Sequence, residues 1–411
     1  MKIAIVNACG FNADYNYGLV AALARQGGFS IDLLDSNQSL HLYDGFPNVR
    51  VYSLLGQEGA AVPLWYKAWR QVRYYWRLFW YVVSTDAGVF HIQWLNRFEL
   101  FERIVVVPWI RMMGKRLVYT AHNVDTHARD DGRSSLLNRM TLRFLYRRID
   151  RIIAHTKSIR AELLAQFGVP IERISVIQHG ILGDQSGRRE VAQQQARTDL
   201  GIPLGARVLL FFGSWAPYKG LDLLIRALSP AISSDPSLHL VVAGPARNDS
   251  YRREIQSLVR ESHLEDRVTM CPAFVPDSAV ETYFSASDCI VLPYRRISQS
   301  GVPFLAYGFG LPVLASRVGG LPETVIPGVT GLLFEPNNTT ALADAVSRYF
   351  TSDLYRNLSR NRARIVELAR AAFSWDTAAA LTGEIYRSLA PADDAQRQVP
   401  LLLPKPNSEY R

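Results

Sequence analysis

The sequence is short of cysteine and has no long apolar run, and each shortage excludes a class of protein. The three cysteines, Cys9, Cys271 and Cys289, lie on or beside apolar segments, and their spacing fits neither a zinc site nor a disulfide framework. No uncharged apolar run approaches the ~20 residues that a membrane-spanning helix needs. Lys2 is followed directly by an apolar segment typical of a first strand, so no cleavable leader is expected. We therefore expect a cytoplasmic protein.

Acidic residues are scarce as well, and the formal net charge is +9. Residues 60–85 contain no acid but combine four cations with nine aromatic residues. In a helix over residues 64–83, one side carries the cations Lys67, Arg70, Arg73 and Arg77, and the other carries Trp, Phe and aliphatic residues. Cations beside Trp and Phe are typical of a helix at a membrane surface. The pattern predicts a peripheral protein on the anionic inner face of the membrane.

The same segment has a second explanation. Its aromatic face can be the core of a domain, with the cations in solvent. A nucleic-acid interface is not expected, because the aromatic residues lie on an apolar face and no known binding motif is present.

A chain of 411 residues exceeds the size of a single hydrophobic core, so two domains are expected. Strands and helices alternate along the chain, including a predicted helix at about 98–113, and this alternation is typical of parallel sheets covered by helices. The polar run 183–199 is the best candidate for a linker between the two domains.

The most informative segment is 208–227, in which an apolar strand leads through a turn into an amphipathic helix. Gly213 permits a sharp turn and the close approach of a ligand. Lys219 precedes the helix, where free amides already favour an anion. The segment predicts a phosphate site, although an ordinary turn with a solvated lysine has the same pattern.

A second strand–turn–helix unit follows the strand that ends at residue 292. Ser300 is a favourable N-cap residue, and the amides of Gly301 and Val302 would point at an anion. Arg295 and Arg296 in the same loop are further candidates for a phosphate contact. Two such units, both at the carboxyl ends of strands, predict an active site in a cleft between domains.

Together these segments resemble the retaining GT-B glycosyltransferases of the large family four. Members often carry a G-x-x-x-x-x-K-G turn, an S-D-x-x-x-x-P strand, a G-x-P-V-x-A strand and a V-G-G-x-x-E motif. In this chain the motifs run from Gly213 to Gly220, Ser287 to Pro293, Gly310 to Ala315, and Val318 to Glu323. Their order and spacing match across the C-terminal half, and the N-terminal half resembles the family more loosely.

The resemblance implies an α/β protein with two Rossmann-like, doubly wound parallel-sheet domains facing a cleft. The expected parts are an acceptor-binding domain (1–183), a nucleotide-sugar-binding domain (184–375), a helix that crosses back to the first domain (376–390) and a flexible tail (391–411).

The resemblance also assigns roles to individual residues. Donor binding is expected from Gly213, Ser214, Lys219, Ser300, Gly301 and Val302, catalysis from His122 and Lys219, and acceptor binding from Gly10, Tyr15, Asn16, Tyr17, Asp125 and His127. A fixed cation and aimed amides would stabilise the departing diphosphate, and the family places the histidine of its T-x-H-N segment beside the donor sugar. Neither a cofactor nor a metal is expected.

The predicted activity is transfer of a sugar, with retention, from a UDP- or GDP-linked donor to a glycan or polyprenyl-diphosphate-linked acceptor in envelope or exopolysaccharide synthesis. The alternatives are another GT-B enzyme, such as a nucleotide-sugar epimerase, and a non-catalytic nucleotide-sugar-binding protein.

One departure from the family is clear: where many members have two glutamates, Ile297 and Leu305 stand here. Neither can hydrogen-bond a ribose hydroxyl, so the choice between UDP and GDP is open.

Overall fold

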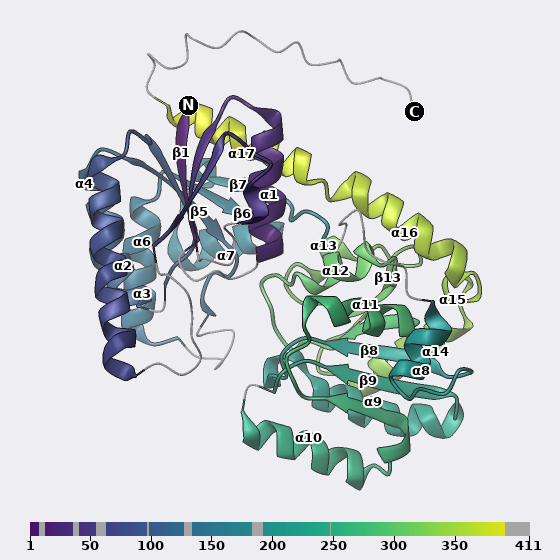
Figure 1. The fold of residues 1–411 in the computed structure, drawn as a ribbon. Helices are drawn as coiled ribbons and strands as arrows, with labels where there is room; N and C mark the ends of the chain where they lie inside the picture. The colour runs from purple at the N-terminus through teal and green to yellow at the C-terminus, as the bar shows by residue number, and fades with distance from the viewer. Residues whose placement is uncertain are drawn as a thin grey trace.

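The computed structural model of the chain describes residues 1–7, 13–35, 41–54, 63–96, 98–126, 134–182, 192–246 and 248–390. Within these ranges the chain forms two α/β units, each built on one parallel sheet (Figure 1). The predicted fold class, two Rossmann-like doubly wound sheets, is therefore confirmed. The predicted tail and residues 183–191 of the predicted linker lie outside the described residues.

The first sheet has seven strands in the order β3-β2-β1-β4-β5-β6-β7. They are β1 (Lys2–Asn7), β2 (Ser30–Asp35), β3 (Val49–Ser53), β4 (Val89–Trp94), β5 (Arg116–Ala121), β6 (Arg151–Ala154) and β7 (Ile174–Val176). The interior strands β1 and β4 are buried along almost their whole length, because helices cover both faces, and this explains their continuous apolar runs.

Helices of the first unit divide between the two faces of its sheet. They are α1 (Ala13–Gln26), α2 (Leu64–Ser84), α3 (Glu99–Phe101), α4 (Val107–Met112), α6 (Leu136–Arg148) and α7 (Lys157–Phe167). Apolar residues of α2, α4, α6 and α7 form one core cluster, and those of α1 form another on the opposite face.

The predicted helix at 98–113 is interrupted. A π-helical segment, Glu102–Val106, separates α3 from α4, and within it the amide of Val107 donates to the carbonyl of Glu102, five residues back. Pro108 follows at once and has no amide to continue the regular ladder. The wider π-helical turn places Glu102 and Arg103 in the interior of the unit.

The second sheet has six strands in the order β10-β9-β8-β11-β12-β13. They are β8 (Arg207–Phe212), β9 (Leu238–Ala243), β10 (Val268–Cys271), β11 (Cys289–Leu292), β12 (Val313–Ser316) and β13 (Gly331–Phe334). Its helices are α8 (Gln193–Asp199), α9 (Leu221–Ser234), α10 (Asp249–Glu261), α11 (Asp277–Ala286), α12 (Val302–Gly308), α13 (Leu321–Thr324), α14 (Thr339–Thr351), α15 (Asp353–Arg356) and α16 (Leu358–Ala372). The strand order reverses between β8 and β11, and open α/β sheets bind ligands at such a point.

The last helix, α17 (Trp375–Leu389), leaves the second unit and lies against α1 of the first (Figure 1). Arg25 of α1 pairs with Asp376, and the Tyr386 ring packs edge-on against Phe29. The end of the chain therefore contributes to the core of the first unit.

Candidate functional site

The turn after β8 places a lysine over a glycine. Gly213 has a φ of 105°, which residues with a side chain rarely adopt. A 3-10 turn, Pro217–Lys219, follows, and Gly220 in the left-handed region opens α9. Lys219 is only 9% exposed, and a methyl group on Gly213 would lie 2.9 Å from its Nζ atom. Two residues predicted to bind the donor are thus brought together.

The loop after β11 runs beside this turn, because β8 and β11 are paired in the sheet. A side chain on Gly220 would collide with the carbonyl oxygen of Pro293, so the turn and the loop are in direct contact. The Tyr294 ring centroid lies 5.8 Å from Lys219 Nζ. The two predicted phosphate-binding segments therefore adjoin each other.

The remaining donor-binding predictions lie on the same two segments. Ser214 is half-buried in the turn, and the Val302 amide lies 3.3 Å from the Ser300 hydroxyl that accepts its hydrogen bond. Gly301 has an ordinary φ of −76°. A Cβ there would meet only Leu182, at 3.6 Å, so the protein itself has room for a Cβ at this position.

Three histidines gather at the carboxyl ends of the first sheet, and we call them the histidine cluster. His122 follows β5 and stacks on Trp94, with ring centroids 4.1 Å apart. The His155 ring lies 5.1 Å from His122 and 5.7 Å from His179. Tyr15 of α1 contacts all three rings at 4.8 to 5.3 Å. The cluster therefore surrounds a buried tyrosine.

Burial keeps the histidine cluster neutral. It lowers the pKa of His155 to about 4 and the pKa of His179 to about 3, and it holds the pKa of His122 well below its usual value. Nδ1 of His155 lies 2.8 Å from the carbonyl oxygen of Ile177, so Nδ1 carries the proton and Nε2 is an acceptor. Nε2 of His122 and Nε2 of His155 have no hydrogen-bond partner among the described residues. Buried polar atoms are normally paired, so these two nitrogens are candidates for contact with a ligand hydroxyl.

The histidine cluster meets the donor segments at α12. The His179 ring stacks on Phe304, with centroids 4.6 Å apart, and the Leu182 amide donates to the Phe304 carbonyl. Phe304 lies two residues after Val302 in the first turn of α12. The contact joins the carboxyl ends of the two sheets at one junction. In the part of the chain that the structure describes, no group of three or more His, Cys, Asp or Glu side chains is placed to hold a metal ion.

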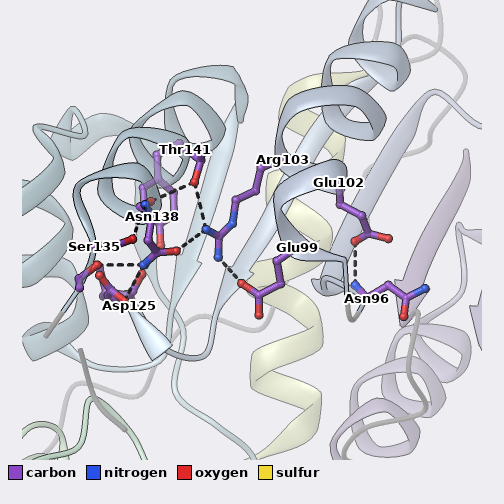
Figure 2. Close-up of polar contacts among 11 residues, drawn as sticks. Asn96, Glu99, Glu102, Arg103, Asp125, Ser135, Asn138 and Thr141 are labelled. Atoms are coloured by element: carbon purple, nitrogen blue, oxygen red, sulfur yellow. Dashed lines mark hydrogen bonds and ion pairs between the residues drawn. The ribbon is translucent and has the colours of Figure 1, made fainter. Parts of the chain in front are cut away.

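Asp125 is buried and belongs to a polar network (Figure 2). Asn138 of α6 donates to Asp125 Oδ1 at 3.0 Å and accepts from Arg103 Nη1 at 2.7 Å. Arg103 also pairs with Glu99. Because Arg103 comes from the π-helical segment, that segment fixes the position of Asp125 through Asn138.

Glu102 lies next to this network and is itself buried (Figure 2). Its Oε2 accepts a hydrogen bond from the amide of Asn96 at 2.7 Å. Burial raises the pKa of Glu102 to about 7. A carboxyl group that titrates near neutral pH is common at functional sites, and the sequence analysis did not single it out.

The other predicted acceptor-binding residues differ in their placement. Tyr15 and Asn16 are buried, whereas Tyr17 is half-buried against Tyr43. Gly10 and His127 lie outside the described residues.

Two side chains have partners that the sequence analysis did not predict. Arg295, a candidate phosphate ligand, pairs with Asp222 at 2.6 Å. The Glu323 carboxylate accepts hydrogen bonds from the amides of Lys157 and Ser158, each at 2.8 Å, and so caps α7 of the other unit. The V-G-G-x-x-E motif made Glu323 visible, but nothing in the sequence connects it with residues 157 and 158.

Helix α2 exposes a stripe of aromatic residues. The stripe consists of Trp65, Trp69, Trp76 and Trp80, which are 49 to 71% exposed. Lys67 and Arg77 are exposed on the same helix, and the Arg73 guanidinium lies 4.8 Å from the Trp69 ring centroid. Arg70 is buried, as is Tyr74 one turn further along, so the expectation that all four cations are available to a membrane surface was wrong. None of the described helices is both long and apolar enough to cross a bilayer.

Two models of protein families match the chain. The model for glycosyltransferase family 4 matches residues 14–182, and the model for glycosyl transferases group 1 matches residues 206–352. Each match corresponds to one of the two units, and together the matches cover most of the chain.

Curated relatives are about a third identical to this chain over the aligned segments. A D-inositol 3-phosphate glycosyltransferase of Corynebacterium glutamicum is 31% identical over 279 residues, which is 66% of this chain and 66% of the relative. An enzyme of the same name from Streptomyces avermitilis is 33% identical over 58% of this chain and 51% of its own length. The chain therefore spans about half to two thirds of these relatives.

Solved structures share the fold across both units. Sucrose-phosphate synthase from Thermosynechococcus elongatus superposes with a TM-score of 0.71 at 23% identity, covering 95% of this chain and 99% of that one. Anabaena HepE, in complex with UDP and glucose, superposes with a TM-score of 0.72 at 20% identity, covering 94% of this chain and all of HepE. Likeness at this level of identity shows the fold alone.

Proposed function

Because the chain belongs to glycosyltransferase family 4, we propose that it transfers a sugar, with retention, from a nucleotide-diphosphate sugar to a lipid-linked or polysaccharide acceptor. The observation that carries the proposal is the junction of Lys219 with the Ser300–Gly301 loop, beside the neutral histidine cluster. A UDP-linked donor is the first choice, since HepE of the same fold was crystallised with UDP and glucose.

The residues at this junction suit the chemistry of sugar transfer. The bond between the anomeric carbon and the diphosphate breaks, the oxygen of an acceptor hydroxyl bonds to the anomeric carbon, and the hydroxyl proton passes to the diphosphate, on which negative charge grows as it leaves. Lys219 and the amides near Gly213 and Gly301 would stabilise that charge. His122, held neutral by burial, would accept a hydrogen bond from a hydroxyl of the sugar without repelling the positive charge that develops on the ring.

Acceptor recognition is assigned to the first unit. Asp125, held by Asn138, would accept hydrogen bonds from acceptor hydroxyls, and Tyr17 lies at the start of α1 on the same unit. The exposed tryptophans and cations of α2 support an anionic membrane surface as the source of a polyprenyl-diphosphate-linked acceptor. The names of the curated relatives favour a second candidate, a small phosphorylated polyol.

Gly301 provides a direct test of the donor site. A Cβ at this position makes only an ordinary contact with the protein, so we expect Gly301→Val to fold while its side chain blocks the approach of the phosphates. Calorimetry should show UDP binding to the wild type and at least 10-fold weaker binding to Gly301→Val at an unchanged melting temperature. Unaltered UDP and GDP affinity in the folded variant would contradict the assignment.

Lys219→Ala tests the chemical step. Loss of one preorganised electrostatic contact typically costs on the order of 100- to 1000-fold in turnover. Exposed Lys157 offers a matched control, and Lys157→Ala should retain full activity. Donor turnover without any acceptor would instead favour an epimerase, and donor binding without turnover would favour a non-catalytic binding protein.

A further inference from the structure

We infer that Arg295 and Asp222 act as positioning residues for Lys219 and do not bind the diphosphate themselves. The inference rests on the proposed function, because it assigns Lys219 to the leaving diphosphate. It replaces the role that the sequence predicted for Arg295, direct contact with phosphate.

The contacts of Arg295 account for most of its hydrogen-bonding capacity. Its two terminal nitrogens donate to the two carboxylate oxygens of Asp222, at 2.8 and 2.6 Å, in a fork-to-fork arrangement. Nη1 also donates to the carbonyl of Pro217 at 2.8 Å, and the Arg295 backbone amide donates to the carbonyl of Tyr218 at 2.8 Å. Arg295 therefore holds the two residues that immediately precede Lys219.

Asp222 is held by Tyr251 as well as by Arg295. It lies in the first turn of α9, where an acid is favoured, and it accepts a hydrogen bond from the Tyr251 hydroxyl at 3.1 Å. Burial would raise the pKa of Asp222, but the hydrogen bonds and charge of Arg295 outweigh burial and lower it. The carboxylate is therefore charged at neutral pH and available to hold the guanidinium.

The backbone on both sides of Lys219 is thereby fixed. Tyr218 is bound to Arg295 on one side, and Gly220 abuts Pro293 on the other. Both anchors belong to the loop that leads to Ser300, so one loop fixes the lysine turn and continues into the second phosphate-binding segment. A cation that is already in place when charge develops needs no reorganisation during the reaction.

The test is a double-mutant cycle with calorimetric binding of UDP and of inorganic diphosphate. Arg295→Gln and Asp222→Asn should each weaken binding of both ligands about 10-fold. In a Lys219→Ala background the same substitutions should have almost no further effect, because they act through the lysine. Arg295→Lys keeps the charge without the fork, so it should not restore affinity. Arg253, exposed on α10, gives the control Arg253→Gln, which should bind like the wild type.

The outcomes separate the two proposals. Suppose that the wild type binds diphosphate and UDP, and that the losses of affinity from Arg295→Gln and Lys219→Ala add. Arg295 then contacts the ligand directly, so the positioning inference is overturned while the donor site stands. Full rescue by Arg295→Lys overturns it in the same way. If the wild type binds neither diphosphate, UDP nor GDP, the proposed function fails, and the inference fails with it. Should Arg295→Gln not fold, Asp222→Asn carries the same cycle.

Discussion

Glu102 is a single residue that makes the stability of the folded protein depend on pH. Its carboxyl group is buried, accepts one backbone hydrogen bond and has a pKa near 7. The folded protein therefore binds a proton at Glu102 between the unfolded pKa, about 4.5, and the folded pKa, about 7. The stability that this protonation contributes is present below pH 4.5 and is lost as the pH rises through 7.

Glu102→Gln should remove that dependence, since glutamine is neutral at every pH and can still accept from the Asn96 amide. In urea unfolding, the variant should match the wild type near pH 5 and be more stable by on the order of 2–3 kcal/mol at pH 9. Equal stability differences at the two pH values would show that the carboxyl group does not titrate near 7. Glu99→Gln, next to it in the network, tests whether the effect is specific to Glu102.

At the scale of elements, α2 has a buried side and an exposed aromatic side. Its buried side carries Tyr74, Leu78 and Arg70, and its exposed side carries the tryptophan stripe. Soluble surfaces rarely expose several large apolar side chains together, and cations beside them favour an anionic lipid surface.

We expect the protein to bind vesicles that contain phosphatidylglycerol and to be released by salt. Each Lys or Arg near such a surface contributes roughly 1 kcal/mol, so the triple variant Lys67→Gln, Arg73→Gln, Arg77→Gln should bind about 100-fold more weakly. Sedimentation with anionic and neutral vesicles measures this. Replacement of Arg253, Arg360 and Arg364, which are exposed on the second unit, is the matched control. Equal sedimentation of all three proteins would end the membrane proposal.

At the scale of the whole molecule, Glu323 connects the two units. Its carboxylate caps α7 of the first unit, and Gly320 allows Thr156 to approach, since a Cβ at 320 would collide with the Thr156 side chain. A carboxylate at a helix N-terminus pairs with free amides and with the helix dipole. The contact therefore favours the arrangement in which the two sheets meet.

Glu323→Ala should lower the free energy of unfolding by about 0.5–2 kcal/mol, as removal of a helix cap does. Hydrogen exchange at the amides of Lys157 and Ser158 should become faster, while exchange in the core strands stays the same. The exposed Glu335 provides a control, Glu335→Ala, that should leave α7 protected. Unchanged exchange at both amides in Glu323→Ala would mean that the cap does not hold the units together.

Local sequence determined the alternation of strands and helices, because apolar periodicity and glycine placement act over short distances along the chain. Gly213 and Gly220 could be predicted to lie in a turn, because glycine is favoured where the backbone turns sharply between a strand and a helix, and both residues have a positive φ. Sequence also indicated that Lys219 and Ser300 each follow a strand, whereas the pairing of those strands, β8 and β11, came from the structure. These features explain why the fold was predictable, while the donor-binding roles of the two segments stay predictions.

Tertiary structure alone decided which partner each side chain meets. Arg295 is 73 residues from Asp222, and Glu323 is 166 residues from Lys157, so no local pattern distinguishes an ion pair or a helix cap from a phosphate ligand. The sequence also did not decide which face of α2 is buried, because helical periodicity separates two faces without saying which one packs on the sheet. Contacts between distant segments settle these questions, and such contacts depend on how the completed sheets bring the chain together.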